Sequence, residues 1–430
     1  MLDRNSTTYH KVLSIFIYLV LGVFTLAKGA LYSPDSYSFL ALDFHRSIGY
    51  NSFLKVVTSL FGDSFETPLI LFQLALLIGA TLYLIKVIEK LFDLHFIWLL
   101  LLQLLIIAPA FYLHFVVNNI FSEALAYPLF LVFTGCVLKG FVINSTKHYF
   151  YASVVLFLLL LVRGQFIAMI PVLLILVTIQ AIQSKFNRAI LILIGVLIVM
   201  PFISGLTEKV YNKAVYDHFE RTPFSNVSLI APAFYVANEN SHELFKTEEQ
   251  KTFFKEVYAT LDSLNLSKAK VEESGSESYL VFHANYSKVC NLSIHETGTL
   301  HFEKQGLDKN QQLIAVNDLC GEMVLPLIKE NFKDWLRLYI DNLKNAFGSG
   351  KQLLLFLMLL VASLVFIFNQ NETSIAKFIF TLVLVVFANM TIVPFAVHSI
   401  KRYLFYTDWV FFAILILLMS EIFTKKTGEV

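Results

Sequence analysis

Charged residues are scarce in this chain of 430 residues. Asp, Glu, Lys and Arg together make up 15% of it, while hydrophobic residues make up 57%. A typical soluble domain is about a quarter charged and about half apolar. The composition therefore excludes an ordinary soluble domain and indicates an integral membrane protein that crosses the bilayer several times.

Net charge and cysteine are low as well. The 33 Lys and Arg against 32 Asp and Glu leave a net charge of +1, so no overall positive field attracts nucleic acid or another polyanion. The three cysteines include no Cys-x-x-Cys pair, which leaves a zinc or haem site without support. We find no internal repeat, low-complexity run or heptad array, and the 42 Phe suit helices that face lipid.

A signal-peptide cleavage site is missing after the first apolar run. The polar start MLDRNSTTYHK leads into a run of about 18 apolar residues, which is longer than the core of a signal peptide. The stretch LAKGALYS that follows is a poor match to a small-residue cleavage site. We therefore expect an uncleaved signal anchor.

Long apolar runs are abundant. About 20 apolar residues cross the hydrocarbon of a bilayer as a helix, and about ten runs approach that length. We predict an all-α polytopic membrane protein in which the short fifth run forms a tight hairpin with the sixth around RGQ. The predicted spans are 12–30, 68–88, 95–114, 121–140, 149–162, 165–183, 188–206, 352–369, 375–396 and 403–424.

Lys and Arg concentrate in alternate short loops, which predicts the orientation of the chain. Basic short loops stay in the cytoplasm, and an even number of spans returns the C-terminus to the side of the N-terminus. We expect both termini in the cytoplasm, and the frequent Lys, Asn, Ile and Phe favour a bacterial inner membrane. The basic residues of the cytoplasmic loops are Lys86, Lys90, Lys139, Lys147, Lys185, Arg188, Lys377, Lys425 and Lys426.

Three parts follow from this plan. Residues 1–206 form a transmembrane core of about seven helices whose first outer loop is 31–67, and residues 351–430 supply the C-terminal helices. Between them, 207–350 is rich in Asn, Ser, Glu and Lys. We predict that it is a soluble extracytoplasmic insertion of α or α+β structure.

The insertion carries two further predictions. Cys290 and Cys320 both lie in it; outside the cytoplasm a disulfide between them is allowed, and two buried free thiols are the alternative. Its last stretch, LPLIKENFKDWLRLYIDNLKNAF, places its apolar residues on one helical face. A helix of that kind lies in the membrane interface, and we expect the same of YNSFLKVVTSLFGDSF in the first outer loop.

Five charged residues at the ends of spans fall on the outer side: Asp35, Glu123, Arg163, Lys401 and Arg402. Ionisable residues at or within membrane helices are costly and are candidates for function. These five come from distant parts of the chain, so their placement on one face is not a consequence of local sequence. The pattern predicts a polar cavity for an anionic ligand with a reactive end.

Each of the five also has a purely structural interpretation. Asp35 in SPDSYSF and Glu123 in NNIFSEALAY stand where a helix begins, and an acidic residue there favours the helix dipole. Arg163 can snorkel to lipid headgroups. Lys401 and Arg402 can anchor the last span beside an aromatic belt. The residues with a weaker functional case are Asp43, on a solvated face, Tyr403, in the aromatic belt, and His114 and His398, both more typical of the interface.

At these residues the sequence resembles the GT-C class of membrane glycosyltransferases, which use polyprenyl-phosphate sugars as donors and include the protein mannosyltransferases. SPDSYSFLA is similar to the first outer loop of that class, whose Asp is catalytic. IIAPAFYLHFVVNNIFSEALAYPLF is similar to its Pro-ended third span and the Ser-Glu that opens the fourth. LVRGQFIAMIP and VHSIKRYLFYTDW are similar to its hairpin Arg and its late Arg-Tyr, although LFYTDW stands where prolines commonly follow.

The resemblance implies transfer of a sugar on the extracytoplasmic face to a lipid, glycan or protein acceptor. Asp35 would be the general base, and Glu123 would orient the acceptor or an arginine. Arg402, with Arg163 or Lys401, would hold the donor phosphate. One displacement would invert the anomeric centre. If Asp35 and Glu123 instead share a divalent cation, a metal-assisted variant follows, although no dedicated metal motif is visible.

Other classes of protein remain open. An O-antigen or exopolysaccharide polymerase or ligase also acts on lipid-linked sugars, but the strong acidic residue in the first outer loop favours the glycosyltransferase. A transporter or flippase typically shows paired halves and broken helices at mid-membrane, and the sequence shows neither. A structural membrane scaffold leaves the clustering of charges unexplained.

Overall fold

The computed structural model describes residues 4–112, 115–184, 187–369 and 374–427. Over these residues the regular structure is helical, and the one β element is an isolated parallel bridge between Leu31 and Asn119. The chain forms two compact units. The first unit comprises Met1–Thr207, Leu355–Asn389 and Lys401–Val430, and the second comprises Glu208–Leu354 and Met390–Ile400.

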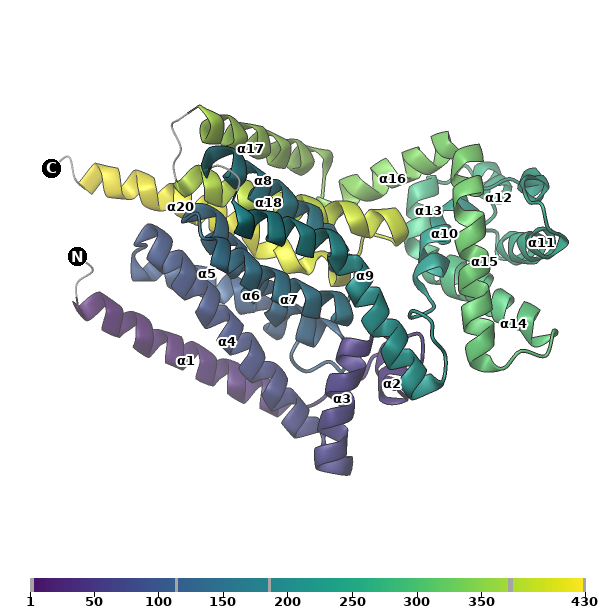
Figure 1. The fold of residues 1–430 in the computed structure, drawn as a ribbon, viewed down its shortest axis with the longest axis horizontal. Coiled ribbons are helices and arrows are strands. Elements are labelled where there is room, and N and C mark those ends of the chain that lie inside the picture. The colour runs from purple at the N-terminus through teal and green to yellow at the C-terminus, as the bar shows by residue number, and fades with distance from the viewer. Residues whose placement is uncertain (1–3, 113–114, 185–186, 370–373, 428–430) are drawn as a thin grey trace. The chain divides into compact units, whose positions relative to one another are not determined.

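The first unit is a bundle of apolar helices (Figure 1). Its helices are α1 (Arg4–Lys28), α2 (Pro34–Leu40), α3 (Ile48–Phe61), α4 (Glu66–Phe92), α5 (Phe96–Phe111), α6 (Glu123–Val142), α7 (Thr146–Val162), α8 (Met169–Ser184), α19 (Lys401–Leu404) and α20 (Asp408–Thr427), with short 3₁₀ turns at Gly62–Ser64, Gly164–Ala168 and Phe405–Thr407. Helices α9 (Arg188–Tyr216), α17 (Gly350–Phe368) and α18 (Ser374–Ala396) run from one unit into the other along the chain.

Eight helices among the described residues are long and apolar enough to cross a membrane, which supports an integral membrane protein. The other two predicted spans, 95–114 and 149–162, form the shorter helices α5, of 16 residues, and α7, of 17 residues. Both are shorter than the roughly 20 residues that typically cross the hydrocarbon. Helix α7 ends where it does because Arg163 adopts an extended backbone, with φ −153° and ψ 118°.

Burial divides these helices into a centre and a periphery. In α6, 78% of the apolar span is buried, and it packs between α4 and α7. In α1 and α17 only 17% of the span is buried, and side chains such as Phe16, Val23 and Val361 are exposed. Exposed apolar surface of this extent requires an apolar solvent, which here is lipid.

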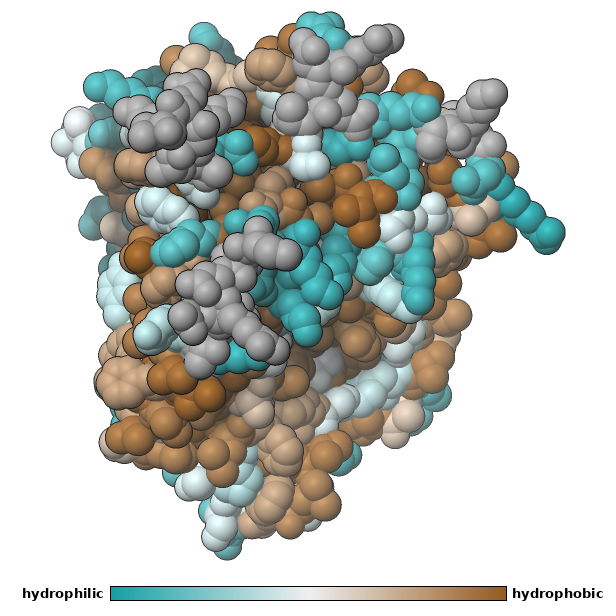
Figure 2. Space-filling model, turned by 90° about the vertical axis from the view of Figure 1, so that its left-hand side faces the viewer, coloured by the Kyte–Doolittle hydropathy of each residue, from teal (hydrophilic) through white to brown (hydrophobic). Residues whose placement is uncertain are grey.

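The N-terminal end of α1 and the C-terminal end of α20 lie on the same side of the first unit in Figure 1. Figure 2 looks at that end and shows apolar side chains over its lower part, with hydrophilic side chains gathered around the middle and top. Asp35 follows the far end of α1, and Arg402 precedes α20. These two residues therefore lie at the end of the bundle opposite to the start of α1 and the end of α20.

The second unit is helical in its described residues, which decides between the α and the α+β alternatives for the insertion. Its helices are α10 (Ser225–Tyr235), α11 (Glu248–Ser263), α12 (Lys268–Glu273), α13 (Ser278–Ser287), α14 (Thr297–Glu303), α15 (Lys309–Glu330) and α16 (Phe332–Ala346), with a 3₁₀ turn at Glu239–Leu244 and a π-helix at Lys288–Glu296. A single apolar core joins them. Cys290 and Cys320 are buried in this core as free thiols, so they form no disulfide.

The stretch predicted as one amphipathic helix forms two. Helix α15 ends and α16 begins at Asn331, whose backbone leaves the helical region with φ −103° and ψ 27°. Trp335 stacks on Tyr339, with ring centroids 5.7 Å apart, and is buried in the unit's own core. Part of the apolar face therefore serves the interior of the second unit, while Phe332 stays exposed. An interfacial position for α16 remains a prediction.

Residues 390–400 belong to the second unit, which the sequence did not indicate. Among the bonds that hold them there are those of the buried Asn342 of α16. Its amide donates to the carbonyl oxygens of Pro394, at 3.0 Å, and Val397, at 2.8 Å. Its Oδ1 accepts the backbone N–H of Ser399 at 2.9 Å. An amide with its donors and its acceptor oxygen bonded in this way holds an irregular segment in one conformation.

Candidate functional site

The segments before Asp35 and before Glu123 are joined by backbone pairing. The Leu31 N–H donates to the Asn118 carbonyl oxygen at 2.8 Å, and the Ile120 N–H donates to the Leu31 carbonyl oxygen at 3.2 Å. The Asn118 amide also donates to the Gly29 carbonyl oxygen at 2.8 Å, next to the end of α1. Residues about 90 positions apart thus start α2 and α6 side by side.

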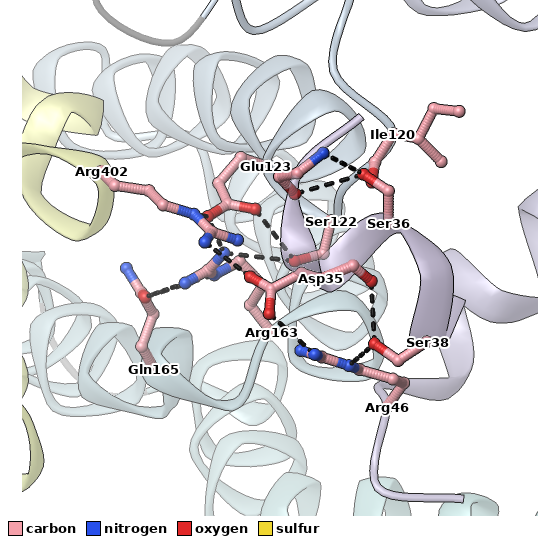
Figure 3. Close-up of polar contacts among 11 residues, drawn as sticks. Asp35, Ser36, Ser38, Arg46, Ile120, Ser122, Glu123, Arg163, Gln165 and Arg402 are labelled. Carbon is pink, nitrogen blue, oxygen red and sulfur yellow. Dashed lines mark hydrogen bonds and ion pairs between the residues drawn. The ribbon is translucent and has the colours of Figure 1, made fainter. Parts of the chain in front are cut away.

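Helix α2 begins as its sequence predicts. Pro34 is its first residue, and the Ser36 hydroxyl accepts the backbone N–H of Ser33 at 2.8 Å. The same hydroxyl donates to the Ile120 carbonyl oxygen at 2.9 Å, which binds α2 to the approach to α6. The first turn is therefore stabilised by serines and proline. The carboxylate of Asp35 is directed instead toward arginine side chains (Figure 3).

Five charged side chains form a continuous row, which we call the charge row: Arg46, Asp35, Arg402, Glu123 and Arg163 (Figure 3). Arg46 Nη2 lies 2.7 Å from Asp35 Oδ1, and Arg402 Nη1 lies 2.6 Å from Asp35 Oδ2. Arg402 Nε lies 2.6 Å from Glu123 Oε1, and Arg163 Nη1 lies 2.7 Å from the same oxygen. Each carboxylate therefore lies between two guanidinium groups, and Arg402 is shared by both.

The two carboxylates differ in accessibility. Glu123 is fully buried, whereas 27% of the Asp35 side chain is exposed. Arg46 and Arg402 are each 23% exposed, and Arg163 is 14% exposed. The end of the row at Asp35 can meet a ligand, while the end at Glu123 is closed.

Polar and aromatic neighbours hold the arginines in place. The Ser122 hydroxyl accepts a bond from Arg163 Nη1 at 3.2 Å, and Gln165 Oε1 accepts from Nη2 of the same guanidinium at 3.2 Å. The Gln165 amide in turn donates to Asn389 Oδ1 at 3.1 Å. The ring of Tyr403 lies 5.5 Å from the Arg163 guanidinium and 5.9 Å from that of Arg402, distances at which a cation is attracted to an aromatic face.

A buried aromatic cluster next in sequence to these groups ties their elements together. The Tyr406 ring lies 5.6 Å from that of Phe130 in α6 and 5.1 Å from that of Phe166, which follows Arg163 by three residues. All three rings are fully buried. Because buried aromatic groups contribute much of a core's packing energy, the cluster fixes the starts of α6, α8 and α20 relative to one another.

The charge row carries an excess positive charge. With all groups ionised, three guanidinium groups and two carboxylates sum to +1. Burial by itself would raise the pKa of Asp35, but the charges of Arg46 and Arg402 outweigh it and lower that pKa below its ordinary value. Asp35 is therefore ionised at neutral pH, and in this arrangement it is a weak base.

Four of the five outer charges predicted from the sequence meet in this row, and the fifth does not. Lys401 is 63% exposed and lies 3.5 Å from Asp408, away from the carboxylates that bind Arg402. It is the neighbour of Arg402 in a helical turn, so its side chain leaves in another direction. The structure thus places Lys401 outside the charge row.

The secondary candidates have separate positions. Tyr403 flanks the two arginines of the row. Asp43 is half-buried in the turn after α2, where its carbonyl oxygen accepts the N–H of Arg46 at 3.0 Å. His398 belongs to the second unit, where its ring stacks on Tyr286 with centroids 4.5 Å apart. His114 lies outside the described residues.

Arg46, Gln165 and Asn389 were missed by the sequence analysis. Arg46 follows Asp35 by eleven positions in a loop with several other polar residues, and nothing in that spacing marks it. Asn389 lies within an apolar run, where a lone amide is a detectable signal because a buried polar group requires a partner. Gln165 lies two residues after Arg163 in the RGQ turn. The sequence analysis identifies that turn but predicts no function for Gln165.

Among the described residues, no group of three or more His, Cys, Asp and Glu side chains comes together in a way that could hold a metal ion. The position between Asp35 and Glu123, where a shared divalent cation would have to lie, is occupied by the guanidinium of Arg402. The residues present therefore do not fit a shared ion in this arrangement, and we derive no step through one.

Comparison with known protein families, with curated proteins and with solved structures finds no match for this chain. The inference about its function therefore rests on the charge row and on the membrane-spanning helices.

Proposed function

We propose that this protein is a membrane glycosyltransferase of the GT-C type, which transfers a sugar from a polyprenyl-phosphate donor to a lipid, glycan or protein acceptor. The observation that carries the proposal is the contact of Arg402 with Asp35, at 2.6 Å, between residues 367 positions apart in the chain. It supplies a carboxylate and a guanidinium at one partly exposed point, at the end of the helix bundle.

The arginines suit a phosphate ligand. A guanidinium presents its donors in a planar fork that matches phosphate oxygens. Arg402 is partly exposed and contacts Asp35, so its guanidinium can meet a phosphate beside that carboxylate. A polyprenyl chain stays in the bilayer, so its phosphate has to be met where the membrane helices end, which is where the charge row lies.

Asp35 is the residue placed to act as base. In the proposed step the acceptor oxygen forms a bond to the anomeric carbon while the bond from that carbon to the phosphate oxygen breaks. The hydroxyl proton passes to Asp35, and the electron pair leaves with the phosphate, which Arg402 stabilises. Proton transfer to a positioned group contributes about 10²–10⁴-fold to a rate. A single displacement of this kind inverts the anomeric centre.

Of the two roles expected for Glu123, orienting the acceptor or orienting an arginine, its contacts favour the second. Because it is fully buried and bound to Arg163 and Arg402, it does not reach an acceptor. It is a positioning residue that fixes the direction of Arg402. Arg163 is bound to the same buried carboxylate, so it supports the row from inside and is a weaker candidate for direct phosphate contact.

The location of the site follows from the orientation proposed for the chain. With both termini in the cytoplasm, the charge row lies on the extracytoplasmic side of a bacterial inner membrane. The second unit lies in the sequence between membrane helices that end on that side, and we assign to it the selection of the acceptor. Both assignments rest on the distribution of Lys and Arg in the loops.

The proposal is tested by sugar transfer in membrane vesicles that contain the full chain and a radiolabelled polyprenyl-phosphate sugar. Asp35→Asn and Arg402→Ala should each lower transfer by at least about 100-fold, and Asp35→Asn should do so with expression and membrane insertion at the level of the natural protein. Asp63→Asn and Arg188→Ala are matched controls, since both residues are exposed and neither belongs to the charge row, and they should retain transfer.

Three outcomes would contradict the proposal. Full transfer by Asp35→Asn would show that Asp35 is not the general base. Use of an oligosaccharide pyrophosphate but not a single-sugar phosphate would indicate a polymerase or ligase. Net movement of the lipid-linked sugar across the membrane without its consumption would indicate a transporter.

A further inference from the structure

Asp35 is bound by two arginines of different origin. Its Oδ2 accepts from Arg402, which comes from α19 and also binds Glu123. Its Oδ1 accepts from Arg46, which lies eleven residues along the same loop. If a phosphate binds Arg402, it competes with Asp35 for that guanidinium, whereas Arg46 remains bound to Asp35. A phosphate can therefore replace Asp35 as the partner of Arg402, while Arg46 stays bound to Asp35.

Local contacts fix Arg46 independently of the rest of the row. Its Nε donates to the Ser38 hydroxyl at 2.7 Å, and that hydroxyl donates to the Asp35 carbonyl oxygen at 2.8 Å. Its guanidinium also lies 4.9 Å from the ring of Phe39. Asp35, Ser38, Phe39 and Arg46 are therefore joined within twelve residues by contacts that involve no residue of α6, α7 or α19.

We propose that Arg46 is a positioning residue that keeps Asp35 ionised and oriented toward the acceptor when a lipid phosphate draws Arg402 away. This inference rests on the proposed function, because it takes the anion to be a phosphate on a lipid. In the bound state Arg402 binds the phosphate and Glu123, and Arg46 binds Asp35. Each charge then has a partner, and the excess positive charge of the row is neutralised by a singly charged phosphodiester.

The charges around Asp35 predict the direction in which the affinity for the phosphodiester changes with pH. The charged and titratable groups that face Asp35 are Arg46 from its own loop, Arg402 and Tyr403 from α19, and Glu123 from α6. Once Arg402 is engaged by phosphate, burial raises the pKa of Asp35, and Arg46 is the cation that lowers it. Without Arg46 the carboxylate would take up a proton as the phosphodiester binds. Binding would then weaken as pH rises.

The test measures binding of farnesyl methyl phosphate, a prenyl phosphodiester with one negative charge, to the full chain in detergent micelles from about pH 4 to about pH 8. The natural protein should bind it with nearly constant affinity across this range. Arg46→Gln should bind about 10- to 100-fold more weakly at the upper end than at the lower end, which corresponds to a rise of about one to two units in the pKa of Asp35.

Three further variants make the result specific. Arg46→Lys retains the positive charge and should restore most of the flat profile. Lys55→Gln removes an exposed positive charge from α3, in the same outer loop, and should leave the profile unchanged. In an Asp35→Asn background the affinity should not vary with pH, and adding Arg46→Gln should introduce no variation. A merely structural role for Arg46 would not produce this pattern.

Two results would overturn the inference: a flat profile for Arg46→Gln, or a pH dependence of Arg46→Gln that persists with Asn at position 35. Absence of phosphodiester binding by the natural protein would overturn it as well. The proposed function is judged separately by the transfer assay. If transfer occurs and the Arg46→Gln affinity does not vary with pH, the proposed function stands and the inference about Arg46 fails. If the Arg46→Gln affinity varies with pH as expected but no transfer occurs, the proposed function fails and only the role of Arg46 toward Asp35 is supported.

Discussion

At the scale of the residue, burial separates two carboxylates that the sequence presents alike. Asp35 and Glu123 each stand in the first turn of a helix that follows a membrane exit, and each is bound by two arginines. Glu123 has no exposed surface, and Asp35 does. The same chemical group therefore serves as a structural counter-ion in one position and as a candidate base in the other.

We predict that Glu123→Gln destabilises the protein by about 3–5 kcal/mol, because removal of one partner leaves buried charge without compensation. The measurement is the thermal unfolding midpoint of the purified protein in detergent. Asp408→Asn is the control: it breaks the exposed contact with Lys401, and exposed pairs contribute about 0–1 kcal/mol. Equal midpoints for Glu123→Gln and the natural protein would show that the row does not depend on this carboxylate.

At the scale of the element, one glycine sets the distance between two segments that carry arginines. A Cβ added at Gly49 in α3 would lie 2.8 Å from Val162 Cγ2 and 2.9 Å from the backbone of Leu161, at the end of α7. Arg46 precedes α3 by two residues, and Arg163 follows α7 directly. Close contact of α3 with the end of α7 thus helps to hold both ends of the charge row.

Gly49→Ala is expected to push α3 and α7 apart, since the clash includes backbone atoms that cannot rotate away. The cost should be about 1–3 kcal/mol, which is typical of overpacking, and transfer should fall along with stability. Gly79→Ala in α4 is the matched control, because a Cβ there meets no atom within 4 Å. That variant should be as stable as the natural protein or slightly more stable. Unchanged transfer and stability in Gly49→Ala would contradict the prediction.

At the scale of the whole molecule, the bilayer accounts for features that a water-soluble fold cannot accommodate. Large apolar side chains remain exposed along α1, α9 and α17, while polar groups gather at the helix ends. The first and last helices of the bundle start and finish at the same end. The charge row follows α1 and precedes α20, so it belongs to the opposite end.

This arrangement predicts which positions an impermeant thiol reagent can reach in intact cells. Tyr37→Cys, at an exposed site two residues from Asp35, should be labelled from outside. Lys90→Cys, at the end of α4 that we assign to the cytoplasm, should be labelled only after permeabilisation. The natural cysteines are buried, so the background should be low. The reverse pattern would invert the orientation and place the site in the cytoplasm.

Several properties were available from the sequence because they are local. The length of an apolar run decides whether a helix can satisfy its backbone groups inside a bilayer, so the long spans were predictable one at a time. Charged residues at the ends of the spans could be identified once the apolar runs were known. Counting the spans then predicted that these residues lie on the same side of the membrane. Asp35, Glu123, Arg163 and Arg402 could therefore be selected before their contacts were known.

The tertiary structure alone decided how those charges are used. Arg46 lies in the row because its own loop packs beside Asp35, whereas Lys401 points away from the row because of its position in the turn of α19. At Asn331 the backbone leaves the helical region, so the stretch that the periodicity predicts as one helix forms two. Residues 390–400 belong to the second unit through bonds that include those of Asn342 to Pro394, Val397 and Ser399. Pairing and burial depend on which distant surfaces meet in space, and a pattern of hydrophobic and charged letters along one segment does not contain that information.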